Sequence, residues 1–293
     1  REDSELQVYQ EALSQVELAD KLGIDYVWEV EHHFLEEYSH SAAPEVFLAA
    51  ASQRTKNIRL GHGVMLMSPR FNHPARAAER IAALDLVSNG RVEWGTGESA
   101  TALELEGFLQ TPAEKTEAWR EGAEQAANML AMTPYPGFQG KYFNMPVRNI
   151  VPKPVQKPHP PMWLACSRRE SIHRAARMGL GALAFAFVEP EQAAHWVEEY
   201  YDIIKSDQCV PISHTVNPNV AIVTALSLHE DEQEAIARGT EGFKFFGYSL
   251  GYVAAYGEHT PGRSEVWRKF KEVEATIPAN SGHGGIGTPE QVR

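Results

Sequence analysis

The stretch Ile24-Asp25-Tyr26-Val27-Trp28, which leads into Glu31-His32-His33-Phe34, decides how the rest of this sequence is interpreted. The apolar run predicts a buried strand, and the polar residues after it predict the loop in which that strand ends. Parallel α/β folds place their active sites at such carboxyl ends of strands. Histidine titrates near neutral pH, so an imidazole there can be a general base, a general acid or a metal ligand. A lone histidine would more often only hydrogen-bond a loop, but a cluster of Glu31, His32 and His33 favours a functional site.

Helical and strand patterns alternate along nearly the whole chain. A first helix is expected over residues 6–22 and ends at Gly23. Strands that alternate with helices are typical of βα units, so the order predicts a parallel sheet. The expected strands are residues 24–30, 58–67, 91–95, 162–166, 181–187 and 218–227. The other expected helices are residues 44–52, 73–87, 112–132, 170–178, 190–205 and 230–246.

Six strands are two fewer than a (β/α)8 barrel contains. The chain opens on a helix and closes with Thr288-Pro289-Glu290, which is typical of the first turn of another helix. We therefore predict a single α/β domain over residues 1–293. Its fold is expected to be a (β/α)8 TIM-type barrel that lacks the first and last strands in this chain.

Three segments interrupt the alternation. The proline- and glycine-rich residues 133–161 are expected to form an excursion with a hairpin around Lys141-Tyr142-Phe143. Residues 247–264 are rich in glycine and tyrosine without a clear period, and we expect a mobile loop there. The string Gly282-His283-Gly284-Gly285-Ile286-Gly287 fits a dinucleotide-binding pattern, but no expected strand precedes it, so we interpret it as a loop.

Composition excludes several classes of protein. The 293 residues are 43% apolar and 23% charged, as in an ordinary globular protein. A net charge of −12 argues against nucleic acid or an anionic membrane surface as a partner. No apolar run approaches the roughly 18–20 residues of a membrane-spanning helix. Cys166 and Cys209 are the only cysteines, too few for a disulfide framework, so we expect a cytoplasmic protein.

The loops expected after the strands are mostly apolar or aromatic, which suits a flat organic cofactor. The segment Ser167-Arg168-Arg169-Glu170-Ser171 joins a strand to a helix. Free backbone N–H groups at a helix N-terminus, two hydroxyls and two guanidinium groups together favour a phosphate. The same residues fit equally well a helix capped by Ser167 with its arginines in solvent.

Two further alternatives stay open. Gly61 and Gly63 lie inside an expected strand, and either a planar ring against Gly63 or close strand–helix packing explains the missing side chains. A metal-dependent hydrolase is a minor alternative. Neighbouring residues of a strand point to opposite faces, so His32 and His33 do not suit a single metal ion. No His-x-His or His-x3-His pair supports a zinc site.

At these loops the sequence resembles the bacterial luciferase-like family of flavin-dependent monooxygenases. The resembling segments, in chain order, are Tyr26-Val27-Trp28, Glu31-His32-His33-Phe34, Asn72-His73-Pro74-Ala75-Arg76, Ser88-Asn89-Gly90-Arg91-Val92-Glu93, Gly95-Thr96-Gly97, Pro161-Met162-Trp163-Leu164-Ala165 and Ile286-Gly287-Thr288-Pro289-Glu290. The resemblance implies a (β/α)8 barrel, usually dimeric, that binds reduced FMN supplied by a separate reductase. It also implies that O2 is activated as a flavin hydroperoxide and that one oxygen atom enters a small organic substrate.

The resemblance also assigns site residues. His32 matches the catalytic histidine, and Glu31 or His33 is expected to orient it. Gly63-Val64 matches a strand segment that often carries a non-proline cis peptide against the flavin ring. The other residues expected to contact the cofactor are Gly95, Glu98, Ser167, Arg168, Arg169, Ser171 and Phe185.

One residue departs from the pattern of the family. Many relatives carry arginine after Gly-x-Gly, near the flavin phosphate, whereas this chain has Glu98. A carboxylate repels phosphate unless it is neutralised. We therefore expect Arg168 or Arg169 to bind the phosphate instead, with Glu98 paired to one of them or turned toward the substrate. A deazaflavin-dependent oxidoreductase of the same fold and a non-catalytic partner subunit are the competing interpretations.

Overall fold

The computed structural model describes residues 4–185, 190–256, 260–262, 265–277 and 285–292. Its centre is a curled, all-parallel sheet with the strand order β1-β2-β4-β7-β8-β9, in which β3 also pairs with β4. These strands are β1 (Tyr26–Glu29), β2 (Arg59–His62), β3 (Met65–Leu66), β4 (Val92–Gly97), β7 (Met162–Cys166), β8 (Gly181–Ala184) and β9 (Val220–Ile222). The predicted α/β fold is confirmed: the sheet is the open, half-barrel form of a (β/α)8 barrel, with β1 and β9 at its edges among the described strands.

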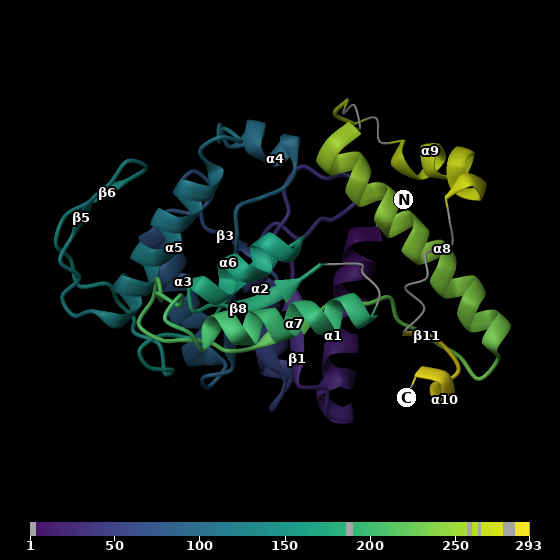
Figure 1. The fold of residues 1–293 in the computed structure, drawn as a ribbon, viewed down its shortest axis with the longest axis horizontal. Helices are drawn as coiled ribbons and strands as arrows, with labels where there is room; N and C mark the ends of the chain where they lie inside the picture. The colour runs from purple at the N-terminus through teal and green to yellow at the C-terminus, as the bar shows by residue number, and fades with distance from the viewer. Residues whose placement is uncertain (1–3, 186–189, 257–259, 263–264, 278–284, 293) are drawn as a thin grey trace.

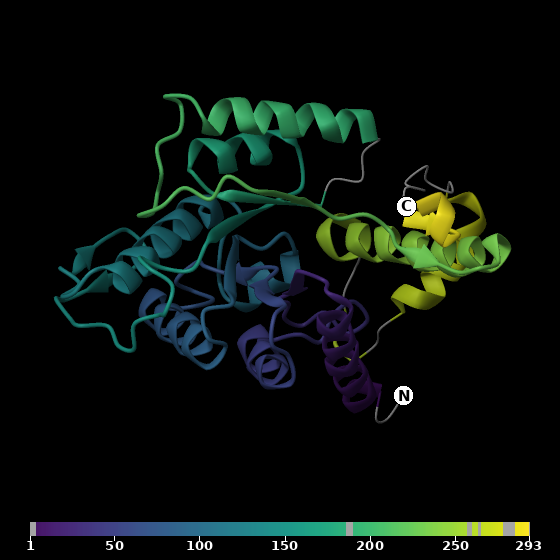
Figure 2. The same ribbon diagram turned by 90° about the horizontal axis from the view of Figure 1, so that it is seen from below.

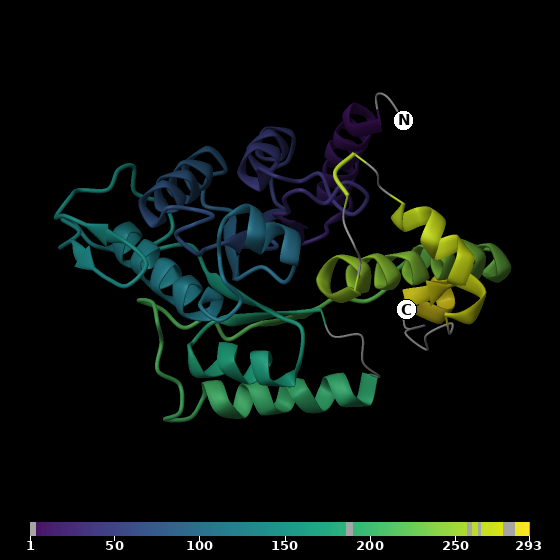
Figure 3. The ribbon, with the colours of Figure 1, turned by 90° about the horizontal axis from the view of Figure 1, so that it is seen from above.

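Helices cover the outer face of this sheet (Figure 1). Figures 2 and 3 show α6 and α7 on the opposite side of the molecule from α1, α2 and α3, as a strongly curved sheet requires. All seven helices expected from periodicity are present. They are α1 (Ser4–Leu22), α2 (Pro44–Arg54), α3 (Pro74–Val87), α5 (Lys115–Ala131), α6 (Arg169–Arg177), α7 (Pro190–Ile204) and α8 (Glu232–Gly251).

The local signals in the sequence explain why these elements begin and end where they do. Helix α3 buries the apolar stripe Ala77, Ile81 and Leu84, and it ends before Asn89 and Gly90, whose φ angles of 56° and 79° are left-handed. The hairpin expected within residues 133–161 is present as β5 (Phe138–Gln139) paired with β6 (Asn144–Met145).

The expected loop at residues 247–264 is wrong for its first part. Helix α8 runs to Gly251 and continues as a π-helical turn, η1 (Tyr252–Tyr256). The reason is tertiary packing against α9 (Val266–Val273), where the fully buried Phe270 ring lies 5.7 Å from the Tyr248 ring. Contacts of this kind leave no period in the sequence. Residues 257–259 and 263–264 lie outside the described residues.

The expected loop at residues 282–287 is also partly wrong. Ile286–Gly287 forms strand β11, which pairs in parallel with β10 (Ser227–Leu228). A two-residue strand is too short to show an alternating pattern. The first residues of that expected loop, 282–284, lie outside the described part of the chain, and α10 (Pro289–Val292) follows β11. None of the described helices has both the length and the apolar character needed to cross a membrane.

His62, the last residue of β2, is fully buried near Glu45 of α2 and Arg80 of α3. Within the described structure neither ring nitrogen has a hydrogen-bond partner. Burial is the main reason that the pKa of His62 falls from 6.5 to about 4. The folded protein therefore holds His62 neutral at a pH where the unfolded chain binds a proton.

This difference predicts a loss of stability on acidification. As the pH falls from 7 to 5, the unfolded chain gains a proton at His62 that the folded chain does not, which lowers the free energy of unfolding by about 2 kcal/mol. His62→Met replaces the titrating imidazole with an apolar side chain of similar size. The free energy of unfolding of this variant should therefore lose this part of its pH dependence. Urea unfolding at several pH values measures it. His229→Met is the matched control, and an equal slope in both variants would contradict the prediction.

Candidate active site

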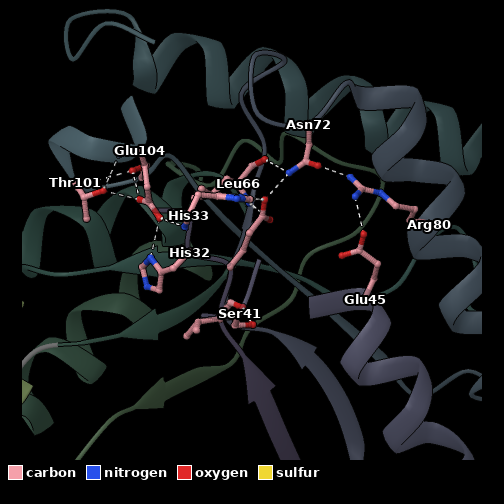
Figure 4. Close-up of polar contacts among 12 residues, drawn as sticks. His32, His33, Ser41, Glu45, Leu66, Asn72, Arg80, Thr101 and Glu104 are labelled. Carbon is pink, nitrogen blue, oxygen red and sulfur yellow. Dashed lines mark hydrogen bonds and ion pairs between the residues drawn. The ribbon is translucent and has the colours of Figure 1, made fainter. Parts of the chain in front are cut away.

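The candidate site lies at the carboxyl ends of the parallel strands, where β1, β3 and β4 end. The loop after β1 carries Glu31-His32-His33-Phe34, and the segment after β4 leads into the short helix α4 (Ala102–Gly107), which supplies Glu104. Figure 4 shows Glu104 and His32 pointing toward each other from these two elements. The site therefore depends on how two loops, far apart in the sequence, are held together.

Glu104 is the centre of the polar contacts. It is fully buried, yet its carboxylate accepts four hydrogen bonds. One oxygen accepts from Nδ1 of His32 at 2.9 Å and from the backbone N–H of His33 at 3.0 Å. The other accepts from the hydroxyls of Ser99 at 2.6 Å and Thr101 at 2.9 Å. Both lone-pair regions of this buried carboxylate are thus satisfied.

These bonds fix the ionisation of Glu104. Burial alone would raise the pKa of its carboxyl, but the hydrogen bonds from His32 and Ser99 and the adjacent imidazole outweigh burial, so the pKa is lowered. An ionised carboxylate can only accept, which places a proton on Nδ1 of His32. Nε2 is then the nitrogen that can exchange a proton with a bound molecule, and the His32 side chain is 23% exposed.

Glu31 has a different task from the one expected. Its carboxylate accepts from the backbone N–H of Leu66 at 2.9 Å and from the amide of Asn72 at 2.9 Å, and it lies 3.1 Å from Nε2 of His33. Successive residues point to opposite sides, so Glu31 faces β3 while His32 faces Glu104. We expected the side chain of Glu31 or His33 to orient His32. Instead, the contact at Nδ1 of His32 is made by Glu104.

The tether made by Glu31 is itself supported from behind. The amide oxygen of Asn72 accepts a hydrogen bond from Arg80 of α3, and Arg80 also pairs with Glu45 of α2 at 2.6 Å (Figure 4). The chain of contacts runs from the loop after β1 to the helices that cover the sheet. It holds Leu66 and the segment before it in a fixed position.

Aromatic rings border His32. The Tyr38 ring stands edge-on to the imidazole, with 5.2 Å between centroids, and Phe246 of α8 stacks on Tyr38 at 6.1 Å. Burial raises the pKa of Tyr38 to about 12, and the charge of Glu104 adds to the shift, so its hydroxyl stays neutral. Beside Phe246 lies a cavity of about 340 Å³ between α8 and the chain that joins β9 to β10. Its lining is mostly apolar and includes Val223, Leu226, Phe243 and Phe246.

The Gly63–Val64 peptide bond is cis, as the family resemblance implied. Gly61 and Gly63 lie against Trp28: a side chain on Gly61 would overlap the Trp28 ring, and one on Gly63 would come within 3.0 Å of its Cβ. The two glycines thus leave space for a tryptophan of the neighbouring strand. This differs from both explanations considered from the sequence, a planar cofactor ring and close strand–helix packing. Gly95 is buried in β4, where a side chain would overlap the carbonyl oxygen of His62.

The segment Ser167-Arg168-Arg169-Glu170-Ser171 forms the N-terminus of α6, next to the end of β7. Its cap is made by Ser171, whose hydroxyl donates to the carbonyl of Arg168 at 2.7 Å and accepts from its N–H at 3.2 Å. Ser167 is therefore not the capping residue. Phe185 follows β8, and its backbone N–H donates to the carbonyl of Cys166 at 2.8 Å, so it borders the same corner.

The arginines of this segment do not pair with Glu98. Arg169 pairs with Glu199 of α7, and Arg168 has a side chain 77% exposed with Glu170 3.9 Å away. Glu98 instead pairs with Arg174 of α6, Oε1 to Nη2 at 3.2 Å. The expectation that Glu98 pairs with Arg168 or Arg169 is wrong, because the long side chain of Arg174, one helical turn after Ser171, points back toward the sheet.

Glu104 is the residue of the candidate site that the sequence did not lead us to name. A signal for it existed: Thr101-Ala102-Leu103-Glu104 matches the capping-box pattern that starts a helix. Thr101 caps α4, with its hydroxyl accepting from the Glu104 N–H at 3.3 Å. In the described part of the chain no three His, Cys, Asp or Glu side chains are arranged to hold a metal ion.

A curled parallel sheet with a histidine–carboxylate pair at the carboxyl ends of its strands is the architecture of (β/α)8-type enzymes. Comparison with known families makes the assignment specific. The chain belongs to the luciferase-like monooxygenase family, whose family model matches residues 1–293.

The individual relatives include one uncharacterized protein and two named monooxygenases. The chain is 33% identical, over 75% of its length, to the uncharacterized protein y4wF of Sinorhizobium fredii, and spans 61% of that protein. It is 24% identical to the oxygenase component of the flavin-dependent trigonelline monooxygenase of Acinetobacter baylyi, over 84% of this chain and 67% of that one. It is 27% identical to limonene 1,2-monooxygenase of Rhodococcus erythropolis, over 98% of this chain and 70% of that one.

Solved structures show the same fold. Monooxygenase RslO1 from Streptomyces bottropensis superposes with a TM-score of 0.78 at 28% identity, over 97% of this chain and 80% of that one. The oxygenating constituent of 3,6-diketocamphane monooxygenase from Pseudomonas putida, solved with FMN, has a TM-score of 0.71 at 18% identity over 99% and 82%. An F420-dependent secondary alcohol dehydrogenase has a TM-score of 0.72 at 17% identity over 97% and 83%.

The contacts of Glu104 predict the effect of removing its charge. In Glu104→Gln the amide nitrogen faces groups that donate, so at least one buried donor loses its acceptor. We expect a loss of about 1–3 kcal/mol in the free energy of unfolding. The matched control is Glu106→Gln, an exposed residue on the same helix, which should change stability by less than about 0.5 kcal/mol. Chemical denaturation of the three proteins tests this, and equal stability of the two variants would refute it.

Proposed function

We propose that this chain is an FMN-dependent monooxygenase that transfers one oxygen atom of O2 to a small organic substrate. The observation that carries the proposal is the His32–Glu104 pair at the carboxyl ends of β1 and β4. It offers one imidazole nitrogen to a bound molecule while the other is held by a buried carboxylate. This is the arrangement of a general acid or base with a fixed tautomer.

The residues at this edge fit a phosphorylated flavin. Two buried polar atoms where the chain after β4 meets α6, Oε2 of Glu98 and Nε of Arg174, have no partner among the described residues. An orphaned donor and an orphaned acceptor suit a ligand with both phosphate oxygens and hydroxyl groups. Ser167 and the first N–H groups of α6 would hold the phosphate, and Gly63-Val64, Gly95 and Phe185 would lie nearer the ring.

The reaction divides between the cofactor and the protein. Reduced flavin would supply the electrons that activate O2. His32 would give or take a proton at Nε2, while Glu104 keeps Nδ1 protonated. Tyr38 and Phe246 form an apolar wall that keeps water from the reacting atoms. The apolar cavity beside Phe246 suits an organic substrate without charge.

The comparisons support the finer parts of the proposal. One relative is named as an oxygenase component, which favours supply of reduced flavin by a separate reductase. One structure of the same fold contains FMN. The expected homodimer and cytoplasmic location are part of the same proposal and rest on the family resemblance and the cysteine content.

A deazaflavin-dependent oxidoreductase is the second candidate. It is favoured by the F420-dependent secondary alcohol dehydrogenase of the same fold and by the F420-dependent glucose-6-phosphate dehydrogenase of Amycolatopsis mediterranei, 29% identical over 56% of this chain. A non-catalytic partner subunit is the weaker alternative. A buried, fully hydrogen-bonded carboxylate that fixes His32 is hard to explain in a chain with no chemistry to perform.

A cofactor panel separates the first two candidates. With a flavin reductase and an organic substrate present, we expect an oxygenated product with FMN, and no hydride transfer from substrate to the deazaflavin F420. The measurements are the oxygenated product, compared with a reaction that holds the reductase and FMN without this chain, and the absorbance of F420. Reduction of F420 by an alcohol substrate, without oxygenated product in the FMN assay, would favour the alternative and contradict the proposal.

Removal of the imidazole tests the role of His32. His32→Ala should bind FMN with nearly unchanged affinity, because the phosphate corner is intact. Product formation should fall by roughly 10²–10⁴-fold, the usual contribution of a general acid or base, while H2O2 release per O2 consumed rises. His229→Ala serves as the control and should behave as the unmodified chain. Normal product formation by His32→Ala would end the assignment.

A further inference from the structure

The ion pair between Glu98 and Arg174 is built into the carboxyl edge of the sheet. Glu98 follows β4 directly, and Arg174 reaches it from α6, with 3.2 Å between Oε1 and Nη2. The guanidinium also lies over the indole of Trp119, 5.4 Å from the centroid. Trp119 is fully buried and donates to the Thr96 hydroxyl at 3.2 Å. A fixed aromatic platform and a carboxylate therefore hold the Arg174 charge in one place.

The pair does not satisfy its own polar atoms. Oε2 of Glu98 and Nε of Arg174 are both inaccessible to solvent, and neither has a hydrogen-bond partner in the described structure. Arginine and carboxylate can meet through two parallel bonds, but here one contact of 3.2 Å is made and two buried atoms are left over. A buried donor and a buried acceptor without partners call for a ligand that carries both kinds of group.

Arg174 also lies at the corner expected for a phosphate. It is three residues beyond Ser171 on the same face of α6, and its charge acts on the thiol of Cys166, the residue before Ser167. The two arginines named from the sequence are less suited to this corner. Arg169 is bound by Glu199, Nε to Oε2 at 2.7 Å, and the Arg168 side chain is 77% exposed.

We propose that Arg174 is the cation that binds the phosphate of the flavin and that Glu98 both positions it and weakens its hold. This inference rests on the proposed flavin-dependent function. The side chains of Glu98 and Arg174 are 20% and 27% exposed, and on binding they move apart enough to uncover their buried atoms. The phosphate then accepts from the guanidinium, including the N–H at Nε, and a hydroxyl of the ribityl chain donates to Oε2 of Glu98. Since Glu98 neutralises part of the Arg174 charge and repels the phosphate, the site binds FMN less tightly than a lone arginine would.

The test compares two flavins that differ only in the phosphate. Oxidised FMN and riboflavin are titrated into each full-length variant, and flavin fluorescence gives the two dissociation constants. In Arg174→Gln we expect FMN to bind roughly 10- to 100-fold more weakly, as for loss of a hydrogen bond to a charged group, with riboflavin unchanged. In Glu98→Gln we expect the ratio of the riboflavin to the FMN dissociation constant to rise, because the repulsion of the phosphate is lost, whereas loss of the ribityl contact weakens both flavins alike. The ratio falls in Arg174→Gln and rises in Glu98→Gln, and misfolding does not produce both shifts.

Two control variants complete the design. Arg177→Gln, an exposed residue one turn further along α6, should leave both dissociation constants unchanged. Arg168→Gln tests the assignment made from sequence and should have little effect on the ratio of the two constants. The inference is overturned if Arg174→Gln leaves this ratio unchanged, or if Arg168→Gln lowers FMN affinity instead. If the unmodified chain binds neither flavin, the proposed function fails and the inference falls with it, an outcome distinct from the other two.

Discussion

A single buried carboxylate holds this site together. Glu104 is fully buried, and an ion in that position is costly unless hydrogen bonds replace its lost water. The four donors that satisfy it come from two loops: two from the segment after β1 and two from the segment after β4. Because one carboxylate accepts from both loops, it joins them, and His32 takes its orientation from this contact. The same contacts thus stabilise this end of the sheet and set the geometry of the proposed site.

Two carboxylates share the work that the sequence had assigned to one cluster. Glu104 sets the tautomer of His32, whereas Glu31 joins the loop after β1 to the backbone at Leu66 and, through Asn72, to the helices behind the sheet. The contact of Glu104 fixes where the proton of His32 lies, and the contacts of Glu31 fix the position of the loop after β1. The cis peptide Gly63–Val64 lies between β2 and β3, on the strand segment that the proposed flavin would face. An imidazole held in one orientation is a condition of pre-organised catalysis.

The sequence predicted the elements whose formation depends on residues close together in the chain. Strands β1, β2, β4, β7, β8 and β9 and seven helices follow from hydrophobic period, glycine stops and turn residues, and those signals act over a few neighbours. Contacts between residues far apart in the chain could not be predicted from the sequence. Nothing within a few residues of Glu104 shows that His32, some seventy positions away, will meet it. The partner of Glu98 was missed for the same reason, since Arg174 and Arg169 are equally basic and only packing on Trp119 and Glu199 separates them. The helix through Tyr256 and strand β11 likewise depend on distant partners.

The pairing of Glu98 with Arg174 bears on how long a cofactor stays. A flavin that is a permanent part of an enzyme gains from the strongest available phosphate contact. One that arrives reduced from another protein and departs oxidised after each cycle has to be released at a useful rate, and most differences in affinity are differences in the rate of departure. In the proposed site, a carboxylate beside the phosphate-binding arginine shortens that residence. On that assignment, Glu98 makes the flavin behave as a substrate that is exchanged rather than as a group that is kept.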